Sequence, residues 1–599
     1  MLDGEEGDSD EAMNDYANRP WLTSYSPKLA PTIDEVPFSS LGELVDATCS
    51  RFATKPAYSN LGAVLSFADV KRLSDQFAAY LVGDLGLAKG DRIVLQMPNL
   101  LQYPIAVYGA LKAGLVVVNA NPLYTAHEMK KVFVDSGAVA IVVLENFADK
   151  LASVVAETSI RHVILTEVGD LLPGLKRVVT NFVVKRVRHM VPAHDLPGGS
   201  AVSVTRWRDA LASGARLGGV RRATASTTAG GPGVRLPAVG LEDTALLQYT
   251  GGTTGGTKAA IITHHNLLAN QAQMLAPMKL RLHEGEETVI AALPLYHIFS
   301  LTVNALAFFA YGSHNVLITN PRDTDDLVKT LAKTKPSVLI LVSSLAGALM
   351  ENPGFRALDH SGVKLAVAGG MAVRSATAQQ WREVTGGDML EGYGLTEASP
   401  VVSVNPTWET PRVGTIGLPL PSTDIEIRDE EGAVVPLGEP GELCVRGPQV
   451  MSGYWNQPEP SAAVLRDGWL LTGDVATMAP DGFLTIVDRK KDMVVVSGFN
   501  VYPSEVEEVA MLHPKVKDAG VIGVDDDRSG ETIVLFVVPS DPSLTEGELR
   551  AYLKGELAGY KRPTRILFRD ELPKSNVGKV LRRELRDLLD DDTKDDDTK

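Results

Sequence analysis

The chain has 599 residues, of which 44% are hydrophobic and 22% charged. This composition is typical of a globular protein and excludes a mainly disordered one. The formal net charge is -16, but residues 1–18 hold seven acidic and no basic side chains, and residues 590–599 hold six acidic side chains and two lysines. The body therefore has no basic field, so nucleic acid is not expected as a partner.

The cysteines and the lengths of the apolar runs indicate the cellular compartment in which the protein is expected. Cys49 and Cys444 belong to no metal-binding or CxxC spacing, which fits a reducing cytoplasm. The acidic N-terminus lacks an apolar secretion signal, and the sequence contains no run of 18 apolar residues, so secretion and membrane spanning are disfavoured. We expect a cytoplasmic protein.

After an acidic tail and lead-in over residues 1–35, the chain alternates helix-like and strand-like segments. Amphipathic stretches such as SFADVKRLSDQFAAYLVGDLG are followed by short apolar runs such as DRIVLQMPN. Such alternation predicts α/β architecture with largely parallel sheets. A second α/β set is expected from about Asp243 to Asn405, and we expect both sets to belong to one large domain over residues 36–490.

A basic amphipathic segment interrupts the first set at residues 176–191. Lys176, Arg177, Lys185, Arg186 and Arg188 stand there among apolar residues. Such a pattern suits peripheral contact with the inner face of a membrane. It also suits a surface helix packed on the body, and the sequence leaves both readings open. The Gly/Ala/Thr-rich stretch 218–240 predicts a loop.

The pattern changes again in the last third of the chain. From about Gly414, short strands with tight turns predict a β-rich subdomain. Residues 491–589 predict a small, mobile α+β domain, followed by an acidic tail over residues 590–599. Ser504 and Glu507 have the spacing of a capping box at the start of a helix.

A glycine- and threonine-rich loop lies between two apolar runs, with the sequence YTGGTTGGTK from Tyr249 to Lys258. Glycines let backbone N–H groups approach a phosphate chain, threonine hydroxyls add donors, and lysine adds a positive charge. The loop lacks the GK[ST] ending of a Walker A motif. It therefore predicts a phosphate-binding loop of another kind.

Further motifs come after this loop in order. They are EGYGLTE at 391–397, LLTGD at 470–474, DRKKD at 488–492, SGFNVYPSEVE at 497–507 and PKSNVGKVLRREL at 573–585. Together they resemble the core motifs of the adenylate-forming acyl-CoA synthetase superfamily, and most of all those of bacterial long-chain fatty-acid CoA ligases, over residues 36–589. The resemblance implies that a fatty acid and ATP form acyl-AMP and pyrophosphate, after which CoA displaces AMP.

The resemblance also assigns roles by motif position. Lys258, Thr396, Glu397 and Lys579 would be catalytic, with Lys579 bridging the ATP phosphates and the fatty carboxylate, and Glu397 would ligate Mg²⁺, which prefers carboxylate oxygen. Asp474 would accept the ribose hydroxyls, and Arg489 would reach the ribose or phosphate. The remaining nucleotide-binding residues would be Thr250, Gly251, Gly252, Thr253, Thr254, Gly255, Gly369, Gly370, Gly392, Tyr393 and Gly394.

Other implied roles concern domain motion and the two remaining substrates. Lys491 matches the pivot about which the small domain rotates, and Ser497, Gly498 and Phe499 would then line the CoA tunnel. Tyr296, His297 and Phe299 would belong to the acyl pocket, which is expected to be apolar because each buried CH₂ contributes about 0.8 kcal/mol. Ala259 stands where the family commonly has glycine.

Two rival functions and one assembly state remain to be tested. A fatty acyl-AMP ligase would load a carrier protein instead of CoA, and a non-catalytic acyl- or nucleotide-binding protein would lack groups such as Lys579, Glu397 or Asp474, all of which are present. The resemblance also allows a homodimer formed through the large domain.

Overall fold

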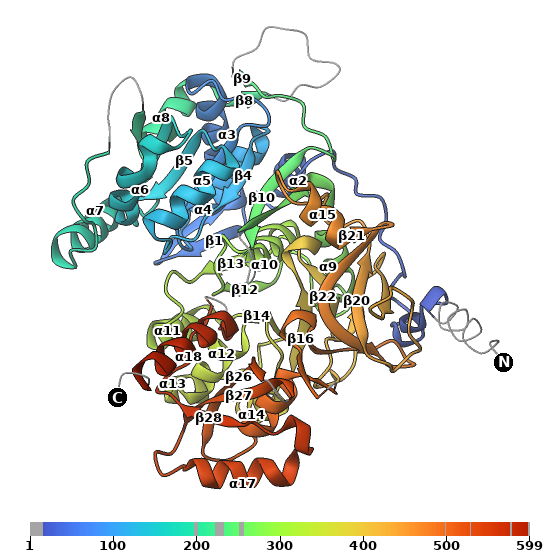
Figure 1. Ribbon diagram of the computed structural model, residues 1–599. Helices are drawn as coiled ribbons and strands as arrows, with labels where there is room; N and C mark the ends of the chain where they lie inside the picture. Colours follow the sequence, from blue (N-terminus) through green and yellow to red (C-terminus); the bar gives the residue numbers. More distant parts are fainter. Residues whose placement is uncertain are drawn as a thin grey trace.

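The computed structural model describes residues 16–196, 202–221, 233–250, 257–497, 499–526, 529–575 and 578–596. Within these residues the strands form sheets of nine, seven, five and five strands and one two-stranded pair, β8 (Val220–Arg221) with β9 (Val234–Arg235). The expected fold is confirmed: two α/β units and a β-rich unit form the large part, and a small α+β unit ends the chain (Figure 1).

The seven-stranded sheet has the order β11-β10-β4-β3-β5-β6-β7. Its strands from β10 to β7 are parallel, whereas β11 runs antiparallel at one edge. The strands are β3 (Arg92–Gln96), β4 (Val116–Asn119), β5 (Ala140–Leu144), β6 (His162–Thr166), β7 (Ser203–Arg206), β10 (Thr244–Thr250) and β11 (Lys258–Thr263). The accompanying helices include α3 (Phe67–Ala79), α4 (Gln102–Lys112), α5 (Ala126–Ser136), α6 (Ala148–Val154), α7 (Gly174–Phe182) and α8 (Trp207–Arg216).

The nine-stranded sheet has the order β18-β17-β16-β15-β14-β12-β13-β1-β2. Its strands are β1 (Pro56–Asn60), β2 (Ala63–Ser66), β12 (Thr288–Ala291), β13 (His314–Leu317), β14 (Val338–Leu341), β15 (Leu365–Gly369), β16 (Met389–Gly394), β17 (Val401–Val404) and β18 (Leu418–Pro419). The helices of this region include α2 (Leu41–Arg51), α9 (His264–Met278), α10 (Ile298–Ser300), α11 (Thr324–Thr334), α12 (Ser343–Glu351), α13 (Pro353–Arg356) and α14 (Ser375–Thr385).

The two α/β units exchange strands, which corrects the expected division near Asp243. The early strand β1 pairs with β13 in the second sheet, and the later strand β10 pairs with β4 in the first. Leu246 and Leu247 of β10 are fully buried and lie opposite Val117 and Val118 of β4. The pairing of buried apolar residues from distant parts of the chain, rather than the order of the strands in the sequence, decides which sheet β1 and β10 join.

The β-rich unit and the small unit come next in chain order. The first contains β19 (Asp424–Arg428), β20 (Gly441–Arg446), β21 (Leu465–Arg466), β22 (Trp469–Met478), β23 (Leu484–Arg489) and α15 (Pro458–Val464). The second contains β24 (Val494–Val496), β25 (Phe499–Val501), β26 (Val516–Asp526), β27 (Gly530–Pro539), β28 (Arg565–Phe568), α16 (Pro503–Met511), α17 (Glu546–Glu556) and α18 (Arg582–Asp596). The small unit has its own buried clusters, around Val521 and Leu535 on one face of β26 and β27 and Ile522 and Phe536 on the other.

The small unit lies against the second α/β unit, at the bottom of Figure 1. Its Asp518 forms an ion pair with Arg374, just before α14, at 3.6 Å. Gly578 approaches the large unit so closely that a Cβ there would lie 2.6 Å from Ser344 Oγ. None of the helices in the described ranges is both apolar enough and long enough to cross a membrane.

Candidate functional site

The site is built at the carboxyl ends of β15 and β16. These parallel strands are in register at Gly369 and Gly392, so the segments that leave both strands meet at one edge of the sheet, where open α/β sheets bind ligands. A Cβ on Gly369 would lie 2.9 Å from the Phe299 ring, and one on Gly394 would lie 2.2 Å from the Pro400 carbonyl oxygen. Glycine is needed at both positions because of this close approach.

A pocket of about 750 Å³, counting its part open to solvent, opens at this edge. Gly369, Gly370, Gly392, Tyr393, Gly394 and Thr396 line one part of it. Apolar side chains line the rest: Met274, Met278, Ile298, Phe299, Val303, Ile340, Val367, Leu395, Pro400, Val401, Val404 and Leu420. The pocket thus joins the glycine-rich motifs to an apolar chamber.

His297 and Phe299 line this pocket, whereas Tyr296 is not among its lining residues. His297 Nδ1 accepts a hydrogen bond from the Phe299 amide at 3.3 Å and thereby caps α10. Burial lowers the pKa of His297 to about 4, so the imidazole is neutral at physiological pH. Tyr296 packs against the main hydrophobic cluster instead.

Tyr393, Asp474 and Arg489 form a hydrogen-bonded trio. The Tyr393 hydroxyl donates to Asp474 Oδ2 at 2.6 Å, and Arg489 Nε lies 2.9 Å from Asp474 Oδ1. Strand pairing explains the second contact, because Asp474 of β22 is opposite Arg489 of β23. Burial, and then the Asp474 carboxylate, raise the pKa of Tyr393 far above its ordinary value, so this hydroxyl remains a donor.

Tyr454, which the sequence motifs did not indicate, contacts both Glu397 and Lys258. Its hydroxyl donates to Glu397 Oε1 at 2.7 Å, and Lys258 Nζ lies 4.9 Å from the centre of its ring. Lys258 begins β11, and its carbonyl accepts from the Thr250 hydroxyl at 3.3 Å. The stretch SGYW at 452–455 pairs with β11 through Ile261 and Trp455, which holds Tyr454 beside the loop.

The middle of the glycine- and threonine-rich loop lies outside the described residues. Gly251, Gly252, Thr253, Thr254 and Gly255 belong to this stretch, and Gly498 of the expected CoA tunnel is likewise outside the described residues. Their predicted roles stay predictions. The two ends of the loop are described, and the pairing of Thr250 with Lys258 closes it as a hairpin.

Lys579 enters the same region from the small unit. The Ser575 amide donates to the Lys579 carbonyl at 2.8 Å, and the Lys579 amide donates to Ser575 Oγ at 3.1 Å. Burial, and then the nearby positive charge of Arg489, lower the pKa of Lys579 to about 8, against the opposing effect of Asp474. The residue before it, Gly578, approaches Ser344 and Met371 of the large unit, and Met371 follows the pocket-lining Gly370.

The residues expected at the hinge and the CoA tunnel lie apart from this pocket. Lys491, Ser497 and Phe499 are exposed, and the Phe499 ring stacks on Tyr560 with ring centres 4.7 Å apart. Ser497 has a φ of 52°, a left-handed conformation that is uncommon outside glycine.

The expected capping box at Ser504 and Glu507 is wrong. Helix α16 begins at Pro503, after Tyr502, so Ser504 lies inside the first turn and cannot cap it. Glu507 instead accepts from the Val521 amide at 2.9 Å and from Arg582. Arg582 was not singled out as a functional residue from the sequence, although it lies in the last motif.

Metal binding by the protein alone is not indicated: within the described ranges, no cluster of three or more His, Cys, Asp or Glu side chains could hold an ion. Glu397 is a single carboxylate, half-buried at the pocket region. This donor set fits Mg²⁺ in the manner that is common for nucleotide sites, where one or two carboxylates share the ion with substrate phosphates.

Two family models match the chain. The model described as AMP-binding enzyme matches residues 45–455, and the model described as AMP-binding enzyme C-terminal domain matches residues 505–579. The chain belongs to the AMP-binding enzyme family. Among relatives, this AMP-binding enzyme is 51% identical to a protein of Yersinia pestis named long-chain-fatty-acid–CoA ligase, over 95% of this chain and 97% of that protein.

Solved structures show the same fold. ATP-bound MatB from Rhodopseudomonas palustris is 25% identical, with a TM-score of 0.76 over 91% of this chain and 98% of that one. Apo MatB from the same organism is 26% identical, with a TM-score of 0.66 over 92% of this chain and 99% of that one. The arrangement of this AMP-binding enzyme is therefore closer to the ATP-bound form of MatB than to its apo form.

Proposed function

We propose that this AMP-binding enzyme is a long-chain fatty-acid–CoA ligase. One observation carries the proposal: Tyr393, which lines a pocket that continues into an apolar chamber, is hydrogen-bonded to the Asp474–Arg489 pair, and Gly578, the residue before Lys579, approaches Ser344 and Met371 beside the same pocket. Close relatives along nearly the whole chain carry that name, including the Yersinia pestis protein.

In the first half-reaction, the fatty carboxylate attacks the α-phosphorus of ATP, the bond to the β-phosphate oxygen breaks, and acyl-AMP and pyrophosphate form. Two anions must approach each other, so cationic and N–H groups at the phosphates supply the main stabilisation. Lys579 and Lys258 would provide this charge, and Thr396 would donate to the α-phosphate. Asp474 would accept the ribose hydroxyls, with Arg489 and Tyr393 orienting its carboxylate.

In the second half-reaction, the CoA thiol attacks the acyl carbonyl carbon and AMP leaves. Ser497, Gly498 and Phe499 would line the CoA path after residues 491–589 rotate about Lys491. The exposed positions of Ser497 and Phe499 are compatible with this proposal, and the stack of Phe499 on Tyr560 is a contact that the rotation would have to carry along or break.

Mg²⁺ belongs to the proposal as an ion shared between Glu397 and the ATP phosphates. When bound, it would neutralise part of the charge that develops on the phosphates. Tyr454 holds one carboxylate oxygen of Glu397 by a hydrogen bond and would thereby orient the other toward the ion.

The substrate class is inferred from the chamber. Its apolar lining offers no charged partner for a second carboxylate or an amine among the described residues. Ten buried methylenes would contribute about 8 kcal/mol, which is enough to favour long chains without specific polar contacts.

Incubation with ATP, Mg²⁺ and palmitate, with and without CoA, tests this function through AMP, pyrophosphate and thioester. The ligase forms palmitoyl-CoA only with CoA present. Pyrophosphate release without any CoA-dependent thioester would favour the carrier-loading rival, and no turnover with any carboxylate would favour a binding protein.

We also propose that α7 and the π-helical turn η5 (Val183–Val187) contact a membrane at the inner face of the cell. The inward side of this segment is polar. Asn181 accepts from the Gly169 amide at 2.7 Å and donates to Glu167 at 2.8 Å, and Lys185 lies 3.2 Å from Glu145. The Lys185 ammonium therefore pairs with Glu145 of the protein, and we do not expect it to bind lipid headgroups.

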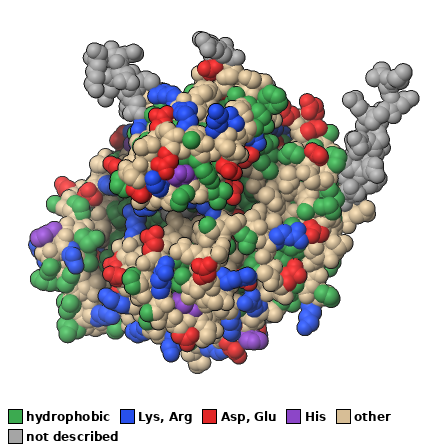
Figure 2. Space-filling view, turned by 90° about the horizontal axis from the view of Figure 1, so that it is seen from below, with side chains coloured by type: hydrophobic (Ala, Val, Ile, Leu, Met, Phe, Trp, Pro, Cys, Tyr) green, Lys and Arg blue, Asp and Glu red, His purple; other side chains and the backbone are tan. Residues whose placement is uncertain are grey.

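The outward side of the same segment is apolar. Leu175, Val178, Val179 and Phe182 recur at helical spacing and are more than half exposed, while Arg186 and Arg188 are exposed beside them. Hydrophobic and basic side chains gather at the left edge of Figure 2, the side on which α7 lies in Figure 1. An apolar face with a basic border matches an anionic bilayer surface, where long-chain fatty acids also partition.

A homodimer through the large unit is a further proposal, supported by the family resemblance alone. Light scattering on the purified protein measures the mass directly, and a monomer mass at micromolar concentration would contradict it.

A further inference from the structure

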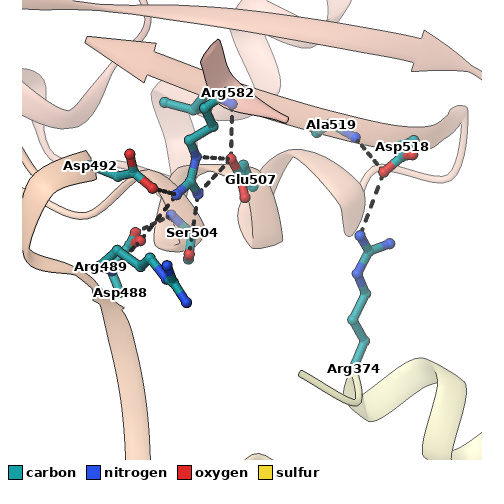
Figure 3. A network of polar contacts seen from close by, with 10 residues as sticks. Arg374, Asp488, Arg489, Asp492, Ser504, Glu507, Asp518, Ala519 and Arg582 are labelled. Carbon is teal, nitrogen blue, oxygen red and sulfur yellow. Dashed lines mark hydrogen bonds and ion pairs between the residues drawn. The ribbon is translucent and has the colours of Figure 1, made fainter. Parts of the chain in front are cut away.

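Arg582 lies at the junction between the two halves of the site. It begins α18 and is three residues beyond Lys579. Its guanidinium lies 3.3 Å from Asp488 Oδ1, 3.0 Å from Asp492 Oδ2 and 2.9 Å from Glu507 Oε1. Figure 3 shows the guanidinium pointing into the middle of these carboxylates.

These carboxylates come from both sides of the proposed pivot at Lys491. Asp488 belongs to β23 of the large unit, whereas Glu507 belongs to α16 of the small unit. The Asp488 side chain is only 2% exposed, and its other oxygen accepts from the Ser504 amide at 2.7 Å. If the small unit turned away, Asp488 would lose both the Arg582 guanidinium and the Ser504 amide. A buried carboxylate that has lost its cationic partner is energetically unfavourable.

The position of Asp488 connects this network to the nucleotide site. In the pairing of β22 with β23, Asp488 is opposite Val475 and its neighbour Arg489 is opposite Asp474. Arg582 therefore ties the segment that carries Lys579 to the strand that carries Arg489.

We propose that Arg582 is a positioning residue: by pairing with Asp488 of the large unit, it holds the small unit in the orientation in which Lys579 serves acyl-AMP formation. The inference rests on the proposed function and on the proposed role of Lys579. It predicts that the network matters for the first half-reaction and not for the second, which uses another orientation of the small unit.

The test separates the half-reactions. Pyrophosphate release with ATP and palmitate measures the first, and palmitoyl-CoA formation from supplied palmitoyl-AMP and CoA measures the second. Arg582→Met should slow the first about ten- to a hundredfold, the effect of losing a buried charged hydrogen bond, and change the second less than about threefold. Asp488→Asn should act in the same direction, and the double variant should be no slower than the slower single variant, because both remove one contact.

Two matched variants serve as controls. Arg374→Met removes the ion pair of 3.6 Å with Asp518 across the same interface. Arg374 is partly exposed and Asp518 keeps its ion pair with Lys574, so the loss should be small and both half-reactions should stay within about twofold. Glu507→Gln removes a partner that moves together with Arg582, so the ratio of the two rates should stay near that of the wild type.

Equal slowing of both half-reactions by Arg582→Met would overturn the inference, since it would indicate a merely structural role. Acyl-AMP formation by Arg582→Met at the wild-type rate would overturn it as well. So would a double variant whose loss of rate in the first half-reaction equals the product of the losses in Arg582→Met and Asp488→Asn. Failure of the wild-type protein to form any palmitoyl-CoA is a different result and would overturn the proposed function itself.

Discussion

At the scale of single residues, the role that we propose for Lys579 in acyl-AMP formation depends on its charge. An ammonium can neutralise two anions only while it is protonated, and burial together with Arg489 lowers its pKa to about 8. A lowered pKa in a lysine means that the cation is present below that value and is lost as the pH rises through it.

The pH profile of kcat/KM for ATP in pyrophosphate release should therefore fall on the alkaline side with a midpoint near pH 8, because kcat/KM reports groups of the free enzyme. Lys579→Arg keeps its charge, so its profile should lack this fall even if its rate is lower. A wild-type profile that stays level well above pH 8, or an identical fall in Lys579→Arg, would contradict the assignment.

Glu391 is a second perturbed group, and the sequence did not single it out. Its side chain is buried, and burial raises its pKa to about 8 from an ordinary value of 4.5, although the Val373 amide donates to it. The folded state thus favours the neutral acid. Its contribution to stability is complete below about pH 4.5 and is lost as the pH rises toward 8.

Glu391→Gln replaces the acid with a neutral side chain of similar shape. Because one pKa unit corresponds to about 1.4 kcal/mol, the variant should gain roughly 2–4 kcal/mol of unfolding free energy over the wild type between about pH 5 and pH 8. Urea unfolding at both pH values measures this difference. Parallel pH dependence in the two proteins would show that the carboxyl is charged in the fold.

At the scale of elements, the segment formed by α7 and η5 turns its polar side to the protein and its apolar side to solvent. Phe182 is 59% exposed, and burial of such a side chain in lipid contributes about 1.5–3 kcal/mol. Phe182→Ser should therefore weaken binding to vesicles that contain an anionic lipid about tenfold or more. Arg186→Gln with Arg188→Gln should weaken the same binding and reduce its salt dependence.

Val413→Ser is the matched control for this experiment, because Val413 is 49% exposed and lies elsewhere on the surface. Co-sedimentation with vesicles measures all variants. Equal binding by Phe182→Ser and Val413→Ser would remove the membrane proposal, and the activity with dispersed palmitate should be unchanged in both.

Element by element, local patterns predicted much of the fold, whereas contacts between distant parts of the chain escaped them. Alternation of apolar runs and helices indicated parallel sheets, and the motifs singled out Tyr393, Asp474 and Arg489, which the structure brings into contact; their nucleotide-binding roles stay predictions. The exchange of β1 and β10 between sheets depends on pairing across long chain separations, for which periodicity holds no signal. Tyr454 and Arg582 act through partners 57 residues or more away in sequence, so no local spacing could reveal them.

At the scale of the whole molecule, the site is shared between two units that meet at one junction. In the proposed mechanism the large unit would supply the pocket, Glu397 and Lys258, and the small unit would supply Lys579, whose neighbour Gly578 approaches Ser344 of the large unit. Closeness to ATP-bound rather than apo MatB agrees with an arrangement suited to acyl-AMP formation. In the proposed second half-reaction, the exposed residues Ser497 and Phe499 would have to reach the pocket, so the small unit would need a second orientation.

Lys579→Ala tests the central claim most directly, with both half-reactions measured on the same preparation. The account predicts that pyrophosphate release with ATP and palmitate falls on the order of 10² to 10³-fold, the usual effect of removing a donor to a developing charge. It also predicts that palmitoyl-CoA formation from supplied palmitoyl-AMP and CoA stays within a few-fold of the wild-type rate. Pyrophosphate release by Lys579→Ala at the wild-type rate would contradict the account.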